Sequence, residues 1–336
     1  MDHSLQRIFD RLVLAATILA VCVVALGAYV RLSDAGLGCP DWPGCYGHLS
    51  VPHTDIAQQV FPNRPLEPHK AWKEMVHRYL AGILGMLILA IFTIAWRVKR
   101  SMAVSPVLPT FLLGLVVFQA LLGMWTVTLL LKPVIVSAHL MGGMSTLGLL
   151  VWMSERRWGG QIFIRAEVVR KIKPWALGGL LVLACQIMLG GWTSSNYAAL
   201  ACTDFPLCQG AWLPPMDFAH AFHLVRELGI NADGSKLPLA ALTAIHWTHR
   251  LGALLTFFYL GGLSVKLLRT SAWNMLGVML GGALLLQLTL GISNVVFSLP
   301  LPVAVSHNAG AALLLILLVL INSRIARASG VGGLKS

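Results

Sequence analysis

The chain is a series of eight long apolar runs separated by polar segments. Each run is close to the roughly 20 residues that a helix needs to cross a bilayer, and none alternates as a membrane β-strand does. The runs span residues 12–30, 76–96, 107–131, 134–152, 175–192, 242–265, 273–297 and 303–321. This pattern predicts an all-α integral membrane protein with eight transmembrane helices.

Composition supports the same fold class. Charged residues make up 11% of the 336 residues and hydrophobic residues 57%, whereas soluble domains carry roughly 25% charged residues. So few charges cannot cover a water-facing surface of this size. The first run is too long for the apolar core of a secretory signal and no small-residue cleavage site follows it, so we expect it to be a span.

The formal net charge of +12 falls on one side of the predicted membrane. With the N-terminus inside and eight crossings, that side receives sixteen Lys and Arg, among them Lys99, Arg100 and Lys335, against four Asp and Glu, and the other side receives nine bases and nine acids. Cytoplasmic loops carry such an excess of basic residues. We therefore expect both termini in the cytoplasm, and the basic balance needs no nucleic-acid partner.

An internal repeat relates the two halves at an offset of 163 to 172 residues. A C-x-D-aromatic-P-x-C motif occurs at 39–45 and 202–208, a His-Arg pair at 77–78 and 249–250, and a Gln-x-x-x-Gly motif at 119–123, 186–190 and 287–291. Because each half has four spans, both enter the membrane in the same direction, as in a parallel repeat. We predict an N-terminal four-helix bundle at 1–155, a cytoplasmic linker at 156–173 and a C-terminal four-helix bundle at 174–336.

Four of the eleven histidines recur in both halves, and they are His77, His139, His249 and His307. Counted from Lys73 and Pro133, the first two lie about 6 to 9 Å below the outer ends of their helices. Two imidazoles at one depth on separate helices can bind a heme iron from opposite faces. The alternative is that each histidine bonds a carbonyl or caps a helix, but repetition at matching depths favours heme over that and over tetrahedral zinc.

The halves differ beside the first histidine, where Glu74 in one half corresponds to His246 in the other. Residues three apart share a helix face, so Glu74 should lie beside whatever His77 binds. A carboxylate in one half alone suggests that this half performs proton chemistry. The alternative is that Glu74 only pairs with Lys70 or Arg78.

Two cysteine pairs, Cys39 with Cys45 and Cys202 with Cys208, fall in the predicted outer loops, where disulfides persist. We interpret them as short structural disulfides, with a redox-active pair as the alternative. We expect the remaining Cys22 and Cys185 to be small buried residues. The loops at 31–73 and 193–241 are long enough to be functional covers. Their aromatic residues could form apolar lids, with anchoring at the membrane interface as the alternative; they are Trp42, Phe61, Trp72 and Trp212.

In their order along the chain, these motifs resemble the heme A synthase family, the membrane enzymes that convert heme O to heme A for cytochrome c oxidase. The resemblance covers eight spans, the segment GAYVRLSDAGLGCPDWPGC at 27–45, the E-x-x-H-R motif at 74–78 and the three further histidines. The paired cysteines resemble those of bacterial members that carry a pair in each half.

The resemblance implies the site residues. The second bundle would hold heme b with His249 and His307 as axial ligands, and the first would take the substrate heme O between His77 and His139. Glu74 matches the carboxylate held to be important for oxidising the C8 methyl of heme O, through successive hydroxylations, to a formyl group.

The resemblance also implies a bacterial inner membrane location with the cysteine loops outside. It implies heme O synthase and cytochrome c oxidase assembly as functional partners, with an unidentified electron donor. Two other functions fit parts of the pattern: a diheme cytochrome b-type electron carrier and a proton-coupled transporter. An electron carrier leaves the difference between Glu74 and His246 unexplained. A transporter would have helices broken by Gly or Pro at the midplane, and the spans do not show them at matching positions.

Overall fold

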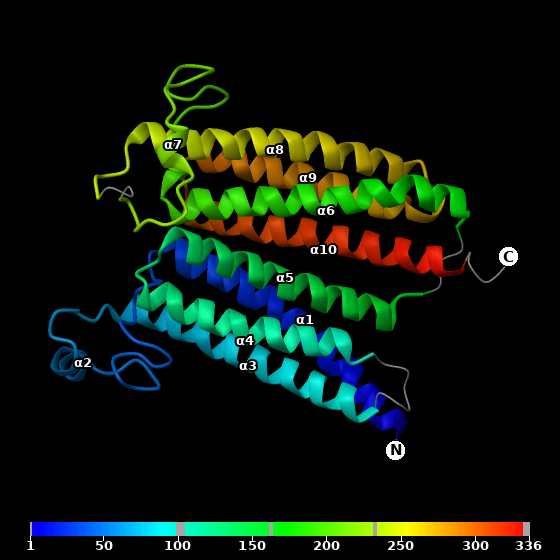
Figure 1. The fold of residues 1–336 in the computed structure, drawn as a ribbon, viewed down its shortest axis with the longest axis horizontal. Helices are drawn as coiled ribbons and strands as arrows, with labels where there is room; N and C mark the ends of the chain where they lie inside the picture. Colours follow the sequence, from blue (N-terminus) through cyan, green and yellow to red (C-terminus); the bar gives the residue numbers. More distant parts are fainter. Residues whose placement is uncertain (1, 99–104, 161–163, 231–233, 332–336) are drawn as a thin grey trace.

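The computed structural model describes residues 2–98, 105–160, 164–230 and 234–331 and is predominantly helical (Figure 1). Within these residues, eight helices are long and apolar enough to cross a membrane, which confirms the predicted multi-pass membrane protein. They are α1 (Asp2–Leu32), α3 (Pro68–Val98), α4 (Val107–Thr128), α5 (Pro133–Trp158), α6 (Ala166–Ser195), α8 (Leu239–Leu268), α9 (Asn274–Val296) and α10 (Leu301–Val331). Lys99, Arg100 and Lys335 lie outside the described residues.

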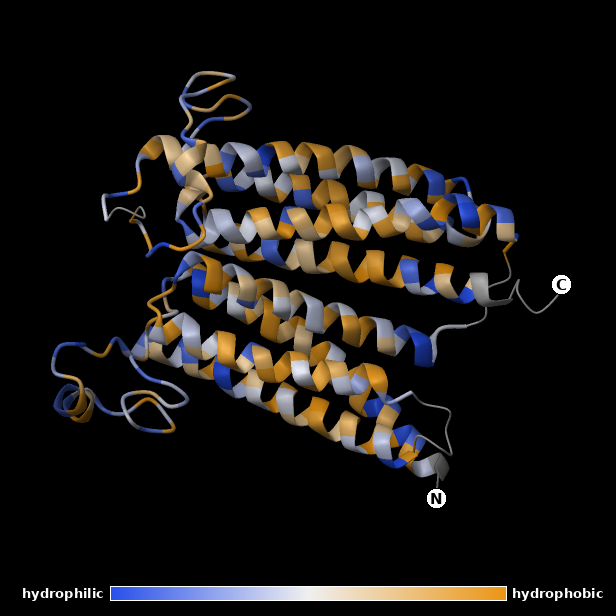
Figure 2. Cartoon of the chain, in the orientation of Figure 1, coloured by the Kyte–Doolittle hydropathy of each residue, from blue (hydrophilic) through white to orange (hydrophobic). Residues whose placement is uncertain are grey.

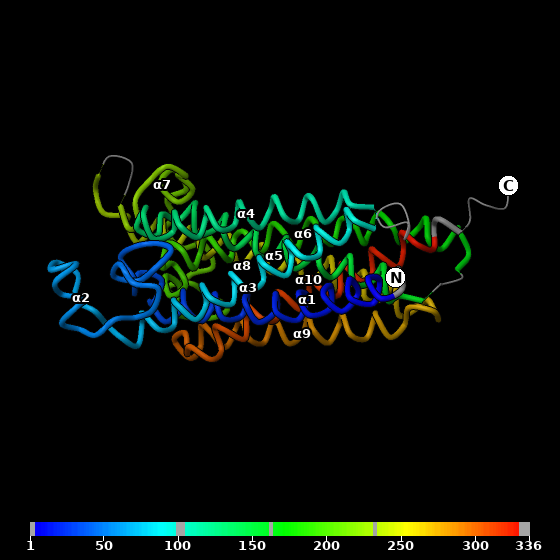
Figure 3. The backbone as a smooth tube through the Cα atoms, turned by 90° about the horizontal axis from the view of Figure 1, so that it is seen from below, coloured from blue at the N-terminus to red at the C-terminus, as the bar shows by residue number. Residues whose placement is uncertain are grey.

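The eight helices form two groups of four (Figure 1). In the first group α1 packs against α3 and α5, and α4 packs between α3 and α5; in the second, α6 packs against α8 and α10, and α9 packs between α8 and α10. The helices of both groups run roughly alongside one another, as a second view also shows (Figure 3). The segments 33–67, 196–230 and 234–238 lie at one end of the molecule, which we call the loop end (Figure 1).

The loop end also contains short helical elements. They are α2 (Thr54–Val60), the 3₁₀ turn η1 (Ala198–Leu200) and α7 (Phe218–Ala221), and a further 3₁₀ turn, η2 (Ser271–Trp273), precedes α9 at the opposite end. Hydrophobic residues dominate the middle of the long helices, and hydrophilic residues gather at helix ends and in loops (Figure 2). This distribution is what a bilayer requires of a helix that crosses it.

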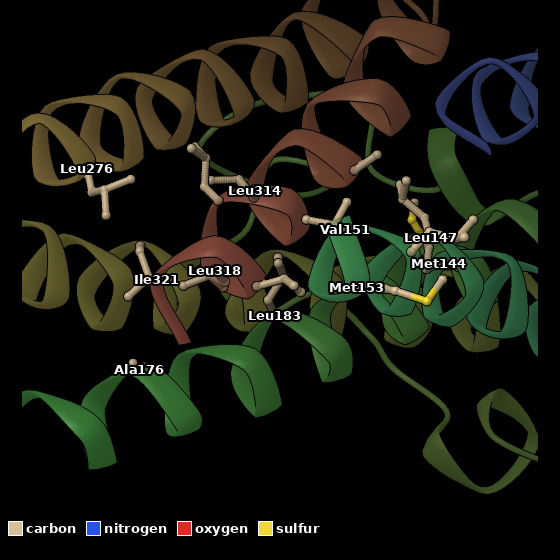
Figure 4. Packing of buried hydrophobic residues seen from close by; sticks show 14 of the residues in the cluster. Met144, Leu147, Val151, Met153, Ala176, Leu183, Leu276, Leu314, Leu318 and Ile321 are labelled. Carbon is tan, nitrogen blue, oxygen red and sulfur yellow. The ribbon is translucent and has the colours of Figure 1, made fainter. Parts of the chain in front are cut away.

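The two groups meet through α1 and α5 on one side and α6 and α10 on the other. Leu147 and Val151 of α5 pack in one continuous apolar cluster with Leu183 of α6 and Leu318 of α10 (Figure 4). Away from the loop end, ion pairs reinforce the contact, because Glu155 of α5 accepts hydrogen bonds from the guanidinium groups of two α10 residues, Arg324 and Arg327. The two groups therefore share an apolar core as well as charged contacts.

The outward faces of the long helices carry large apolar side chains, such as Met86 and Phe258, which are 70% and 66% exposed. Cys22 and Cys185 also lie on exposed faces, so the expectation that they are buried is wrong. The error has a physical cause: in a membrane helix an apolar residue is equally suited to the lipid-facing side and to the core, so hydropathy alone does not distinguish them.

Candidate functional site

A cavity of about 1090 Å³ lies within the first group of helices. Ligand sites in proteins typically have volumes of about 300 to 1,000 Å³, so this cavity is slightly larger than most. It is mostly apolar, and its polar side chains include Arg31 of α1, Glu74 and His77 of α3, Gln119 of α4 and His139 of α5. The structure therefore brings together Glu74, His77 and His139, the first-half residues that the sequence predicted at a heme site.

Each of the four recurrent histidines packs its ring against a glycine on a neighbouring helix. A Cβ atom added to that glycine would lie 3.0 to 3.4 Å from the imidazole Cε1, a distance at which the ring would have to shift. The pairs are Gly27 with His77, Gly123 with His139, Gly190 with His249, and Gly291 with His307. Because these glycines have no side chain, each of the four rings packs directly against the backbone of a neighbouring helix. The four rings thus occupy equivalent positions.

Three of these histidine sites also contain a glutamine from the Gln-x-x-x-Gly motif, which lies in the notch left by a glycine three residues after the histidine. These pairs are Gln119 with Gly142, Gln186 with Gly252, and Gln287 with Gly310. The Gln186 amide lies 3.1 Å from Nδ1 of His249 and donates to its backbone carbonyl at 3.1 Å. Beside His77 the corresponding positions are Val23 and Leu80, so this histidine has no glutamine neighbour of that kind.

Four polar atoms in the first group are buried without a hydrogen-bond partner in the described residues. They are Nδ1 of His77, Nδ1 of His139, the amide nitrogen of Gln119 and Nε of Arg31. Buried polar atoms are normally paired, because leaving one unpaired costs about 1 to 3 kcal/mol. All four residues line the cavity. Such unpaired groups are typical of a site that is completed by a ligand.

Glu74 connects the cavity to the first disulfide loop. One carboxylate oxygen accepts the backbone N–H of Cys39 at 2.9 Å, and the other pairs with the guanidinium of Arg78. The side chain is 5% exposed. The pairing with Arg78 that the sequence offered as an alternative is therefore present, together with the predicted position beside His77.

His246 occupies the corresponding place in the second group and makes the corresponding contacts. Its Nδ1 lies 3.4 Å from the backbone nitrogen of Cys202, and its Nε2 lies 3.2 Å from Nε of Arg250. The two halves therefore use different side chains to hold the same loop against the same helix. Only the first half places a carboxylate at this position.

The two disulfide loops are built alike. Cys39 is bonded to Cys45 and Cys202 to Cys208, with Cα atoms 4.8 and 4.7 Å apart. All four half-cystines are at most 1% exposed. Because thiol exchange requires an accessible sulfur, this burial favours the structural interpretation over the redox-active alternative.

An arginine from the neighbouring helix anchors each loop through backbone carbonyl groups. Arg78 donates to the carbonyls of Asp41, Pro43 and Gly44, and Arg250 donates to those of Cys202, Asp204 and Leu207. In the second loop, the backbone N–H of Gly210 donates to the carboxylate of Asp204, and this hydrogen bond lowers the pKa of Asp204. The sequence identified both arginines as part of the repeated His-Arg pair but did not predict that they anchor the loops.

The model of the COX15-CtaA family, described as cytochrome oxidase assembly protein, matches residues 10–319. The chain belongs to the COX15-CtaA family. The heme A synthase of Shewanella oneidensis is 48% identical over 93% of this chain and 94% of its own length. The heme A synthases of a Caulobacter species and Halalkalibacterium halodurans are each 27% identical, over 89% and 74% of this chain and 90% and 78% of their own lengths.

In this COX15-CtaA chain, the predicted depth of His77 below its helix end is wrong. Helix α3 begins at Pro68, so His77 lies nine residues after its start, or about 14 Å at 1.5 Å per residue. His139 lies six residues after Pro133, or about 9 Å. The apolar run located the span but not its polar first turns, which extend α3 toward the loop end.

The expected apolar lids are only partly present. Trp42 lines the loop end of the cavity, whereas Trp212 is 71% exposed and is not among the cavity-lining residues. Phe61 packs edge-on against Tyr46, with ring centroids 5.6 Å apart. The first loop therefore contributes an aromatic residue to the cavity wall.

Two arginines that the sequence analysis did not single out lie at the loop end. Arg31 lines the cavity and bridges the two groups by donating to the carbonyl of Ser194 at 2.7 Å and to the Tyr197 hydroxyl at 3.1 Å. Arg226 is 4% exposed, donates to the side chain of Asn196, and has its pKa lowered by burial. No repeat or motif indicates either role, because each contact joins segments far apart in the sequence.

Gly38 allows the first disulfide loop to pack directly on α3. A Cβ atom there would lie 2.6 to 2.7 Å from backbone atoms of Lys70 and Ala71, which cannot move aside. We expect Gly38→Ala to lower the free energy of unfolding by about 1 to 3 kcal/mol, as overpacking does, and to lower the melting temperature in detergent. The control is Gly36→Ala, whose Cβ would meet only the side chain of Leu131 at 3.4 Å. Equal melting temperatures of the two variants would contradict this account.

Proposed function

We propose that this chain is a heme A synthase that oxidises the C8 methyl of heme O to a formyl group, giving heme A for cytochrome c oxidase. The observation that supports this most strongly is the first-half cavity, which combines His77, His139 and a buried carboxylate. Its relatives over nearly the whole chain carry the same name. The reaction is a membrane heme-dependent oxidation by successive hydroxylations.

We propose that His77 and His139 bind the substrate heme O, and that His249 and His307 bind a resident heme b. Histidines are suitable axial ligands for heme iron. The four glycine contacts hold the rings in equivalent places, and the unpaired Nδ1 of His77 fits a histidine whose surroundings are completed by a ligand. When bound, heme b supplies one-electron transfer.

We assign the proton chemistry to Glu74. A carboxylate has about four acceptor positions, and two are taken by the N–H of Cys39 and by Arg78. These contacts fix the carboxylate at the cavity wall and leave acceptor capacity toward the substrate. Such a group can orient a reacting hydroxyl or accept its proton.

We further propose that the chain is divided by function, with the substrate half at 1–155, a cytoplasmic linker at 156–173 and the heme b half at 174–336. The excess of basic residues on one side supports an orientation with both termini on the cytoplasmic side of a bacterial inner membrane and the disulfide loops outside. A heme O synthase must supply the substrate, and cytochrome c oxidase assembly consumes the product. An electron donor completes the reaction.

A diheme electron carrier is the second candidate. The specific observation in its favour is that the histidine–glycine contact occurs in both halves, as two permanent hemes would require. It leaves unexplained why the loop contact uses Glu74 in one half and His246 in the other. The two candidates differ in which tetrapyrroles the protein holds.

The test is to purify the full chain in mild detergent, extract its tetrapyrroles and identify them by mass spectrometry. We expect heme B together with heme O, hydroxylated heme O or heme A. Two equivalents of heme B alone would establish the electron carrier instead. Absence of any heme would contradict both the synthase and the electron carrier and would favour the transporter.

A further inference from the structure

The lining of the first-half cavity includes exposed residues of α3 and α4, and we call the space between them the side opening. They include Ile83, Met86 and Val117, which are 51%, 70% and 55% exposed. Both helices lie on the side of the first group away from the second group (Figure 1). In a membrane this side meets lipid, so the cavity communicates with the bilayer interior.

Small residues form this opening. Gly82 and Gly85 of α3 and Ala120 of α4 all line the cavity, and no atom lies within 4 Å of the position of a Cβ on either glycine. Side chains at these positions would extend into the opening. The space between the helices therefore depends on residues that lack bulk.

The second half has large residues at the same positions. The offset of 172 residues that relates His77 to His249 places Leu254 and Phe257 where the first half has Gly82 and Gly85. The offset of 168 residues that relates Gln119 to Gln287 places Leu288 opposite Ala120. Phe257 packs against the buried core. The small residues at the side opening are thus a feature of the first half alone.

The difference is confined to the part of the helices near the histidines. Farther from the loop end the sizes are reversed, with Leu89 opposite Gly261 and Leu113 opposite Gly281. The first half is therefore not simply poorer in large side chains. Its small residues lie on the part of α3 and α4 that is near the histidines of the cavity.

The cavity also has a polar part, which is lined by Arg31, Glu74 and Arg78. The lining residues at the side opening, such as Ile83 and Val117, are apolar. A ligand that fills this space must have a polar part near the charged residues and an apolar part toward the bilayer.

We propose that the α3–α4 opening is a lateral entrance through which an amphiphilic ligand passes from the bilayer, with its apolar chain lying against Gly82, Gly85 and Ala120. Identification of that ligand as the tetrapyrrole substrate rests on the proposed function. The entrance itself does not. The second half has bulky residues at the same positions. It therefore retains its bound ligand, while the first half exchanges its ligand with the bilayer.

The experiment uses the full chain in lipid nanodiscs that contain a fatty acid with a photoreactive group at the end of its chain. After illumination, mass spectrometry of peptides locates the label. We expect label on Leu140 and Gly143 of α5, which line the cavity on the wall opposite the entrance. The double variant Gly82→Leu/Gly85→Phe, whose side chains approximate those of the second half, should lose this label.

The matched control is Gly114→Leu. Gly114 is also an exposed α4 glycine with open space around it, but it does not line the cavity. This variant should keep the label on α5. Unlabelled α5 in the wild-type protein, or equal labelling of the double variant, would overturn the entrance. Wild-type labelling is decisive even where the double variant fails to fold.

Addition of heme O before illumination separates the entrance from the substrate assignment. We expect heme O to protect α5 from the label in the wild-type protein. Labelling that depends on Gly82 and Gly85 but persists in the presence of heme O would reject the tetrapyrrole as the ligand and leave the entrance in place.

Discussion

Replacement of His249 by alanine is expected to abolish the low-spin heme spectrum of the purified protein. Its ring lies against Gly190 and beside Gln186, so no other side chain can take its place without repacking. His307→Ala should have the same effect, because an iron with one histidine is no longer a bis-histidine center. The measurement is the reduced-minus-oxidised absorption spectrum together with the heme B content.

The control for the heme b ligands is His223→Ala. His223 is an exposed histidine of the second loop, and its removal should leave the spectrum unchanged. His77→Ala should also preserve the heme b spectrum while lowering the amount of bound heme O. Retention of the low-spin signal by either His249→Ala or His307→Ala would refute the ligand assignment.

Replacement of Glu74 by alanine is expected to stop the reaction at heme O or a hydroxylated intermediate, with heme b still bound. Loss of a general acid–base group lowers a rate by about 10² to 10⁴-fold. The measurement is the ratio of heme O, hydroxylated heme O and heme A extracted from membranes that express the variant. A normal yield of heme A would contradict the assignment of proton chemistry to Glu74.

The second half supplies a control that separates chemistry from loop support. Glu74→His introduces the side chain with which the second half holds its own disulfide loop. If Glu74 acts only by supporting the loop, this variant should keep much of the activity. If the carboxylate takes part in the reaction, Glu74→His should be as inactive as Glu74→Ala while its melting temperature stays near that of the wild-type protein.

Hydropathy was sufficient to predict the spans, because the bilayer imposes one length and one composition on every crossing helix. It did not predict where α3 begins, since the turns between Pro68 and Lys73 are polar and extend beyond the apolar run. It also gave the wrong environment for Cys22 and Cys185. Both errors arise where lipid, protein interior and interface accept the same residue types.

The sequence repeat predicted which residues gather in the candidate site. It identified the histidines, Glu74 and the Gln-x-x-x-Gly motif, because a buried polar group in a membrane helix requires a reason. It did not reveal that the motif's glycine receives a histidine ring, nor that its glutamine fills a second glycine notch. These contacts join different helices, and only packing shows them.

The contact between the two halves has a further consequence. In the repeat, α1 corresponds to α6 and α5 corresponds to α10. Helix α5 packs against α10, and the contact between α1 and α10 is matched by the contact between α6 and α5. This reciprocity is the property of an isologous interface, in which one surface binds a copy of itself about a two-fold axis. A single four-helix polypeptide carrying this surface would assemble as a homodimer, and fusion of two copies would free each to diverge.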